Sequence, residues 1–158
     1  DPTNEGLEMW SLASGGIRNF RGDVIAENVR IPVNSAVWWD GDLLREMLDR
    51  GSISKYDWTT HQCHTIMDFN SEGCAFNNGS KNNPCLSADI IGDWREEVIV
   101  RSRDNSELRI YSTTIPTQHR LPSLMEDIPY RLGVATQNVS YNQPPHTGYY
   151  IGAETRTF

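Results

Sequence analysis

No stretch of the sequence approaches the roughly 20 consecutive apolar residues that a membrane-spanning helix needs, so we expect no membrane partner. Basic residues are also scarce: 14 Lys and Arg stand against 21 Asp and Glu, a formal net charge of −7, and they form no basic stripe. Such a chain repels a phosphate backbone, so we expect no nucleic-acid partner. An initiator Met and a visible signal sequence are absent, which predicts a processed or partial chain.

Cysteine is scarce as well, with three residues at positions 63, 74 and 85. Zinc sites commonly carry a closely spaced pair of cysteines, and this spacing is absent, which disfavours zinc bound by the cysteines with His61 or His64. In an oxidising compartment, a disulfide between Cys63 and Cys74 would close a short loop, and Cys85 would remain a free thiol. Buried free thiols fit the sequence equally well.

Aromatic residues and turn formers dominate what is present, with five Trp, six Tyr and many Asn. This composition favours β-strands and loops over helices, and predicts an all-β sandwich or propeller of short strands. The clearest hairpin joins Glu97–Arg103 to Glu107–Ser112. A short helix is expected mainly at Leu43–Leu48, with Asp42 as its N-cap. Other strands are expected at Ser35–Trp39, Ser52–Trp58, Thr65–Phe69, Ala88–Ile91, Arg131–Gln137 and Tyr149–Gly152.

The most informative stretch joins two expected strands between residues 88 and 100. Gly92 allows a tight turn, and Asp89, Asp93 and Glu97 surround it. Ca²⁺ binds about six to eight oxygens, mostly from carboxylates and carbonyls, and such a turn aims several carboxylates at one point. The pattern predicts calcium in this loop. The alternative is a solvated acidic turn in which Arg95 pairs with a neighbour.

A second candidate loop contains Asp40 and Asp42 on either side of Gly41. Two carboxylates beside a glycine fit a metal-binding turn. A turn in which Asp42 caps a following helix fits about equally well. The sequence therefore leaves both interpretations open at this loop.

Several longer motifs carry a family resemblance. They are D-G-D-L-L-R-E at 40–46, the acidic stretch at 88–97, L-R-I-Y at 108–111, Y-R-L-G at 130–133 and N-V-S-Y-N-Q-P-P-H at 138–146. Together they resemble the C-terminal part of rhamnogalacturonan lyases of polysaccharide lyase family 11, over nearly the whole chain. The resemblance implies the C-terminal blades of an eight-bladed β-propeller with short antiparallel strands and calcium-binding loops. It also implies action on the rhamnogalacturonan I backbone of pectin.

The same resemblance assigns a substrate cleft. Asn78, Gly79 and Ser80 match the family's N-G-[TS]-K segment, in which they would contact calcium or sugar, and Lys81 would lie against the substrate. Tyr141 would meet the sugar and take part in proton transfer, ahead of a loop stiffened by two prolines. Without the resemblance, the first segment fits an ordinary exposed turn, and the tyrosine fits an aromatic side chain packed under the prolines.

A pectic lyase removes the C5 proton of galacturonate by β-elimination, which requires a cation near the carboxylate, a base and a proton donor. Calcium, Lys81 and Tyr141 would meet these needs, and His119 and His146 are weaker candidates. We therefore expect residues 1–158 to be part of a secreted or periplasmic lyase, inactive alone, that pairs with missing N-terminal blades or with itself. The alternative is a non-catalytic, calcium-stabilised propeller segment that binds pectic carbohydrate.

Overall fold

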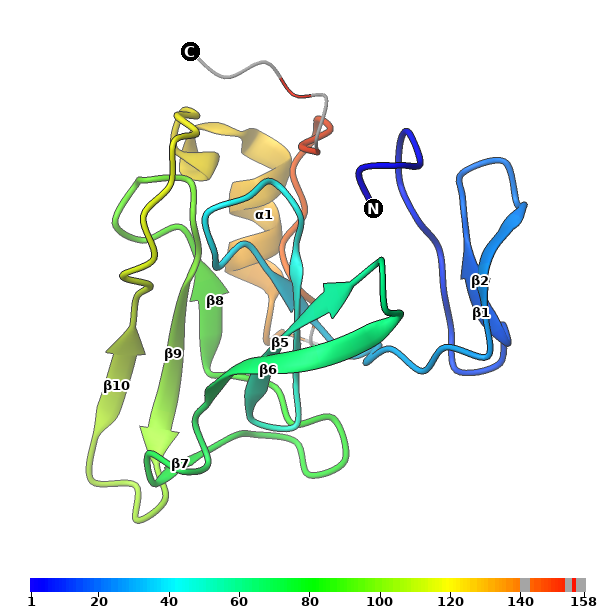
Figure 1. Ribbon diagram of the computed structural model, residues 1–158. Coiled ribbons are helices and arrows are strands. Elements are labelled where there is room, and N and C mark those ends of the chain that lie inside the picture. Colours follow the sequence, from blue (N-terminus) through cyan, green and yellow to red (C-terminus); the bar gives the residue numbers. More distant parts are fainter. Residues whose placement is uncertain (140–142, 153–154, 156–158) are drawn as a thin grey trace.

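The computed structural model describes residues 1–139, 143–152 and 155. They form three antiparallel sheets and two short helical segments (Figure 1). In Figure 1 the two larger sheets lie side by side, helix α1 (Ile128–Thr136) lies next to β8 (Leu86–Ala88), and the hairpin of β1 (Gly16–Arg18) and β2 (Val24–Glu27) stands on the opposite side. No helix in the described ranges is long and apolar enough to cross a membrane.

Each of the two larger sheets contains four strands. The first sheet has the order β3-β4-β5-β6, with β3 (Ala36–Val37), β4 (Glu46–Asp49), β5 (Ser52–Asp57) and β6 (Gln62–Asp68). In the second sheet the central strand is β9 (Glu97–Ser102). It pairs with β10 (Leu108–Tyr111) on one side, and with β7 (Cys74–Ala75) and β8 on the other. The 3₁₀ turn η1 (Leu124–Glu126) precedes α1. The expectation of short antiparallel strands is confirmed, as is the hairpin, which is β9–β10.

The two larger sheets repeat one strand–loop–strand unit. Val37 of β3 pairs with Glu46 of β4 in the first sheet, and Ala88 of β8 pairs with Glu97 of β9 in the second. The two pairs are separated by the same 51 positions in the sequence: residue 37 corresponds to residue 88, and residue 46 to residue 97. The loops between the paired strands are called here the first acidic loop (residues 38–46) and the second acidic loop (residues 89–97).

One buried cluster joins the two larger sheets. The ring of Phe69, which follows β6 and is fully buried, contacts Trp39, Phe76 and Tyr111 at centroid distances of 6.4, 5.5 and 5.0 Å. The other buried members come from strands of both sheets: Val37, Leu48, Ile53, Cys74, Val98 and Val100. Because apolar burial and aromatic contacts are the main favourable terms here, this shared cluster makes the two sheets depend on each other for stability.

The prediction of a helix at Leu43–Leu48 is wrong, because this segment leads into strand β4. Met47 and Leu48 pack into different clusters, as successive residues of a strand do. Asp42 caps a turn in place of a helix, since its Oδ1 accepts a hydrogen bond from the Leu44 amide at 2.7 Å.

The prediction of a strand at Arg131–Gln137 is also wrong, because most of this segment belongs to helix α1. The helix begins with two favourable features: the Asp127 side chain accepts a hydrogen bond from the Tyr130 amide at 3.0 Å, and Pro129 lies in the first turn. The segment Tyr149–Gly152, expected as a strand, is a loop.

The three cysteines are free thiols. Cys74 lies in the cluster that joins the two sheets, whereas Cys63 packs with Tyr56 against a separate cluster formed by the β1–β2 hairpin and β4. One of the two alternatives predicted a disulfide between Cys63 and Cys74. This prediction is wrong, because the two thiols are free and belong to different parts of the core.

Truncating the shared ring tests its role in joining the sheets. Phe69→Ala should lower the free energy of unfolding by about 3–5 kcal/mol, because it leaves a cavity between three aromatic neighbours. Ile110→Ala is the control: this side chain is 63% exposed on β10, and the change should cost less than about 0.5 kcal/mol. Urea unfolding measures both, and equal losses would contradict the shared-core assignment.

Candidate functional site

A buried glutamate begins β4 and holds the first acidic loop in place. The side chain of Glu46 is fully buried, and its Oε2 accepts hydrogen bonds from the amides of Trp39 at 2.8 Å and Asp40 at 3.2 Å. A buried carboxylate is costly unless such donors surround it, so the loop closes onto Glu46.

Three carboxylates converge in this loop. Oxygens of Asp40, Asp42 and Glu46 lie within 4.8 Å of one another, and within the described part of the chain this is the only group of its kind that could hold a metal ion. Lys55 of β5 extends into the group, with its Nζ 2.9 Å from Asp40, 2.7 Å from Asp42 and 2.6 Å from Glu46. The expected convergence of Asp40 and Asp42 is therefore present, but an ammonium group lies within contact distance of all three carboxylates.

Burial and charge act in opposite directions on this group. Burial raises the pKa of Glu46 to about 7, and the Lys55 ammonium limits the rise. Burial lowers the pKa of Lys55, but attraction to Glu46 and hydrogen bonds to Asp40 and Asp42 outweigh it, so this pKa lies above its ordinary value. The lysine is therefore a fixed positive charge at neutral pH.

In the second acidic loop, the buried carboxylate of Asp89 binds donors of the protein itself. Its Oδ1 accepts a hydrogen bond from the Gly92 amide at 2.8 Å, and its Oδ2 accepts from the Leu124 amide at 2.8 Å and the Ser123 hydroxyl at 2.9 Å. Asp89 thereby joins the loop to the start of η1.

The other two predicted ligands of this loop are also engaged. Glu97 accepts hydrogen bonds from the amides of Ile90 at 2.8 Å and Ile91 at 3.0 Å, and Asp93 pairs with Arg95 at 2.5 Å. These carboxylates bind backbone amides and an arginine, whereas the sequence predicted that they converge on calcium. Calcium in this loop stays a prediction.

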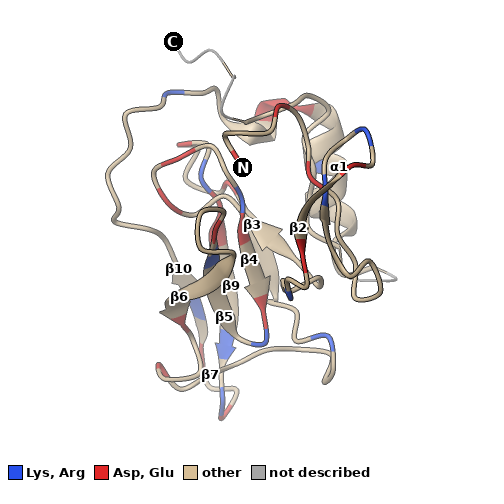
Figure 2. Cartoon of the chain, turned by 45° about the vertical axis from the view of Figure 1, so that its right-hand side comes forward, with Lys and Arg blue, Asp and Glu red and all other residues tan. Residues whose placement is uncertain are grey.

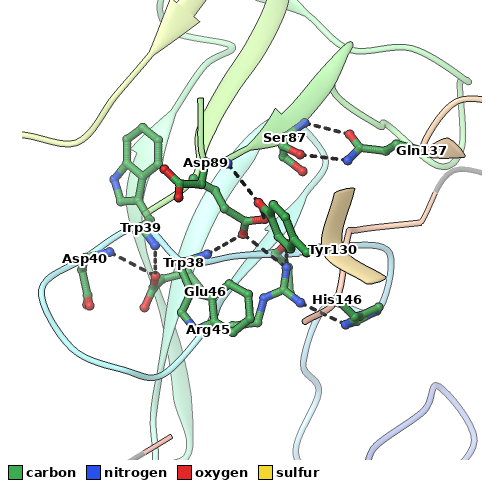
Figure 3. A network of polar contacts seen from close by, with 12 residues as sticks. Trp38, Trp39, Asp40, Arg45, Glu46, Ser87, Asp89, Tyr130, Gln137 and His146 are labelled. Carbon is green, nitrogen blue, oxygen red and sulfur yellow. Dashed lines mark hydrogen bonds and ion pairs between the residues drawn. The ribbon is translucent and has the colours of Figure 1, made fainter. Parts of the chain in front are cut away.

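The buried carboxylate of Glu96 connects both acidic loops to α1. Its Oε2 accepts hydrogen bonds from the Trp38 amide at 2.8 Å and Arg45 Nη2 at 3.3 Å, and its Oε1 accepts from the Tyr130 hydroxyl at 2.8 Å. The same hydroxyl accepts a hydrogen bond from the Asp89 amide at 2.9 Å (Figure 3). In Figure 2, acidic and basic segments lie together near the upper ends of β4 and β9.

Sequence reasoning missed this network. Burial raises the pKa of Glu96, and the Arg45 charge opposes that rise. Burial and the neighbouring Glu96 raise the pKa of Tyr130, so its hydroxyl stays a donor. A signal was available: Arg45 and Glu96 occupy equivalent positions of the repeated unit, each one residue before the glutamate that begins β4 or β9, and carry opposite charges.

The segment expected to bind substrate forms a closed, exposed loop. Asn77 and Asn83 exchange backbone hydrogen bonds of 2.8 and 3.1 Å, and the Lys81 amide donates to the Asn78 carbonyl at 2.8 Å. Asn78 and Gly79 adopt positive φ angles of 59° and 45°, which glycine and asparagine tolerate best. Residues 78–81 are all exposed, so the backbone presents the N-G-S-K segment outward.

The chain after α1 returns to the base of this loop. Gln137 exchanges two hydrogen bonds with the backbone of Ser87, at 2.7 and 2.9 Å, and Gln143 lies close to Asn83 and Gln137. Tyr141 lies outside the described residues. The structure thus brings a residue two positions after Tyr141 to the base of the exposed loop.

The two candidate histidines lie elsewhere. His146 Nδ1 is 3.2 Å from Arg45 Nη1, and burial together with the Arg45 charge lowers the pKa of His146. The backbone carbonyl of His119 accepts a hydrogen bond from Trp94 Nε1 at 3.3 Å. Neither histidine joins the three converging carboxylates.

A cavity of about 600 Å³ opens between the β1–β2 hairpin, the first sheet and residues 146–152. Many of its lining side chains are aromatic: Trp10, Trp38, Tyr56, Trp58, Tyr149 and Tyr150. Residues 78–81 do not line it, so the cavity and the exposed loop are separate features.

Comparison with known proteins identifies relatives of the whole chain. The model of rhamnogalacturonan lyase family 11, C-terminal domain, matches residues 1–158. Rhamnogalacturonan endolyase YesW and exolyase YesX, both of Bacillus subtilis (strain 168), are 49% and 44% identical, and each comparison covers 96% of this chain. The crystal structure of YesW matches with a TM-score of 0.93 at 47% identity, covering 100% of this chain and 26% of that chain.

The fold and its match define a C-terminal domain of the family 11 type. The chain belongs to rhamnogalacturonan lyase family 11, which confirms the resemblance found in the sequence. It spans 24% and 27% of the lengths of the two curated relatives.

The bridging hydroxyl can be removed without changing the ring. Tyr130→Phe should lower the free energy of unfolding by about 1–3 kcal/mol, because it removes the donor to Oε1 of the buried Glu96 carboxylate and the acceptor of the Asp89 amide. Tyr149→Phe is the matched control at a 44% exposed position and should change stability by less than about 0.5 kcal/mol. Equal stability of both variants in urea unfolding would show that the hydroxyl does not hold the network together.

Proposed function

We propose that the chain is the C-terminal part of a rhamnogalacturonan lyase that cleaves the rhamnosyl-galacturonate backbone of rhamnogalacturonan I by β-elimination. The observation that carries this proposal is the family match over residues 1–158. Relatives at 49% and 44% identity are named as rhamnogalacturonan endolyase and exolyase. Since the chain spans about a quarter of their length, the rest of the substrate site would come from other parts of the longer protein.

Within this chain, the exposed 78–81 loop is proposed to bind the substrate. Lys81 would place its positive charge near the galacturonate carboxylate and stabilise the negative charge that develops as the C5 proton leaves. Asn78, Gly79 and Ser80 would hold the sugar with their polar groups. A base would take the C5 proton, the bond from C4 to the glycosidic oxygen would break, and the departing oxygen would be protonated; Tyr141 would take part in this proton transfer. The outward position of the loop and the proximity of Gln143 to its base support this arrangement.

We also propose calcium as the cofactor of the longer enzyme. Beside a uronate, calcium supplies positive charge that stabilises the developing anion. The oxygens of Asn78, Gly79 and Ser80 are of the hard type that this ion prefers, and their loop is exposed. The carboxylates of Asp89, Asp93 and Glu97 are less suited, because donors of the chain already occupy several of their oxygens.

The two larger sheets are proposed to be blades of an eight-bladed β-propeller. Their common register, shifted by 51 residues from 37 to 88, supports a blade repeat. The remaining blades would come from the rest of the longer protein, or the chain would self-associate. Because the proposed substrate is a large polymer of plant cell walls, we place the enzyme outside the cytoplasm, as a secreted or periplasmic protein.

A binding module without activity is the second candidate function. The aromatic lining of the 600 Å³ cavity favours it, because aromatic side chains offer flat apolar faces beside polar groups. Calorimetry with a rhamnogalacturonan oligosaccharide would detect such binding, and the absorbance of an unsaturated uronate product would detect cleavage. Binding by the complete protein without any product would favour this second function.

Substitutions in the complete enzyme test the proposed site. Lys81→Ala and Tyr141→Phe should each lower turnover by on the order of 10²-fold or more, since each removes a group that stabilises charge or moves a proton. Lys81→Ala should leave stability within about 0.5 kcal/mol, because Lys81 is exposed. The control Arg21→Ala, at an exposed position outside the loop and the cavity, should keep full turnover. Full turnover in either of the first two variants would remove that residue from the site.

A further inference from the structure

The first acidic loop has the ligands of a metal site and a lysine among them. The Lys55 ammonium lies 2.6–2.9 Å from an oxygen of each of three carboxylates, two of which, Asp40 and Glu46, are largely or fully buried. A divalent ion bound by all three carboxylates would need the same space between them, and like charges cannot share it. This contact distinguishes the loop from a vacant acidic cluster.

The second acidic loop provides an internal comparison. Ile91 occupies the position equivalent to Asp40, so the third carboxylate is absent there. Met47 pairs with Ser54 in the first sheet, and its equivalent Val98 pairs with Tyr111 in the second sheet. Lys55 follows Ser54, and Ser112 follows Tyr111, so Ser112 stands in the position equivalent to Lys55. The lysine is therefore present where three carboxylates converge and absent where they do not.

We propose that Lys55 is the resident cation of the first acidic loop, in the place where a divalent metal would otherwise bind. The native chain then takes no calcium at Asp40 and Asp42, in contrast to one of the two interpretations that the sequence left open. The ammonium instead connects β5 to the loop and to Glu46 at the start of β4. Removal of the lysine converts the same three carboxylates into a site for a divalent cation. The proposal concerns this loop alone and is independent of the lyase function.

Replacing the lysine tests this directly. Lys55→Met keeps the unbranched stem of the side chain as far as Cε and removes the ammonium group with its charge. In isothermal titration with CaCl₂, the variant should bind one more calcium ion per chain than the native protein, and the double variant Lys55→Met/Glu46→Gln should lose that ion again. Calcium should also raise the melting temperature of Lys55→Met more than that of the native protein. Arg21→Met, which removes an exposed charge elsewhere, should behave as the native protein does.

A second variant decides the question even if Lys55→Met fails to fold. Asp42 is 47% exposed, and an asparagine side chain can keep its hydrogen bond to the Leu44 amide. In the native background, Asp42→Asn should leave both the number of bound calcium ions and the calcium dependence of the melting temperature unchanged. A lost calcium ion in Asp42→Asn, or no gained ion in a folded Lys55→Met protein, would overturn the proposal.

Discussion

The buried carboxylate of Glu96 connects the separate parts of this molecule. A carboxylate removed from water is costly, so its oxygens need donors, and Trp38, Arg45 and Tyr130 supply them. These donors come from the first acidic loop and from α1, while Glu96 belongs to the second acidic loop. The positions of both loops and of the helix therefore depend on one charged group, and α1 in turn leads through Gln137 to the base of the exposed 78–81 loop.

The repeated unit shows how one backbone arrangement accepts different charges. In both acidic loops, a buried glutamate at the start of a strand accepts two amide hydrogen bonds from its own loop, and this part is unchanged between Glu46 and Glu97. The neighbouring positions differ between the two units. Arg45 of the first unit pairs with Glu96 of the second, and the three converging carboxylates of the first unit surround Lys55.

Local signals predicted part of this structure. The β9–β10 hairpin follows from a run of β-branched residues and from the turn residues Asp104 and Asn105. The residues around Glu46 favour a helix, but tertiary burial overrides that preference and the segment forms β4. Asp127 and Pro129 are signals of a helix start, so the sequence does indicate the beginning of α1. Asp89 was predicted as a metal ligand. A carboxylate beside a tight turn suits an ion and backbone amides equally well, so only the fold could show that amides bind it.

The central claim is that this domain contributes the 78–81 loop to the substrate site of a rhamnogalacturonan lyase. A crystal structure of the complete enzyme with a bound rhamnogalacturonan oligosaccharide tests it most directly. The account predicts a galacturonate carboxylate within hydrogen-bonding distance of Lys81 Nζ, with the sugar against Asn78 and Ser80. An oligosaccharide bound only in the aromatic cavity beside Trp10 and Tyr149, with Lys81 remote from it, would contradict the account.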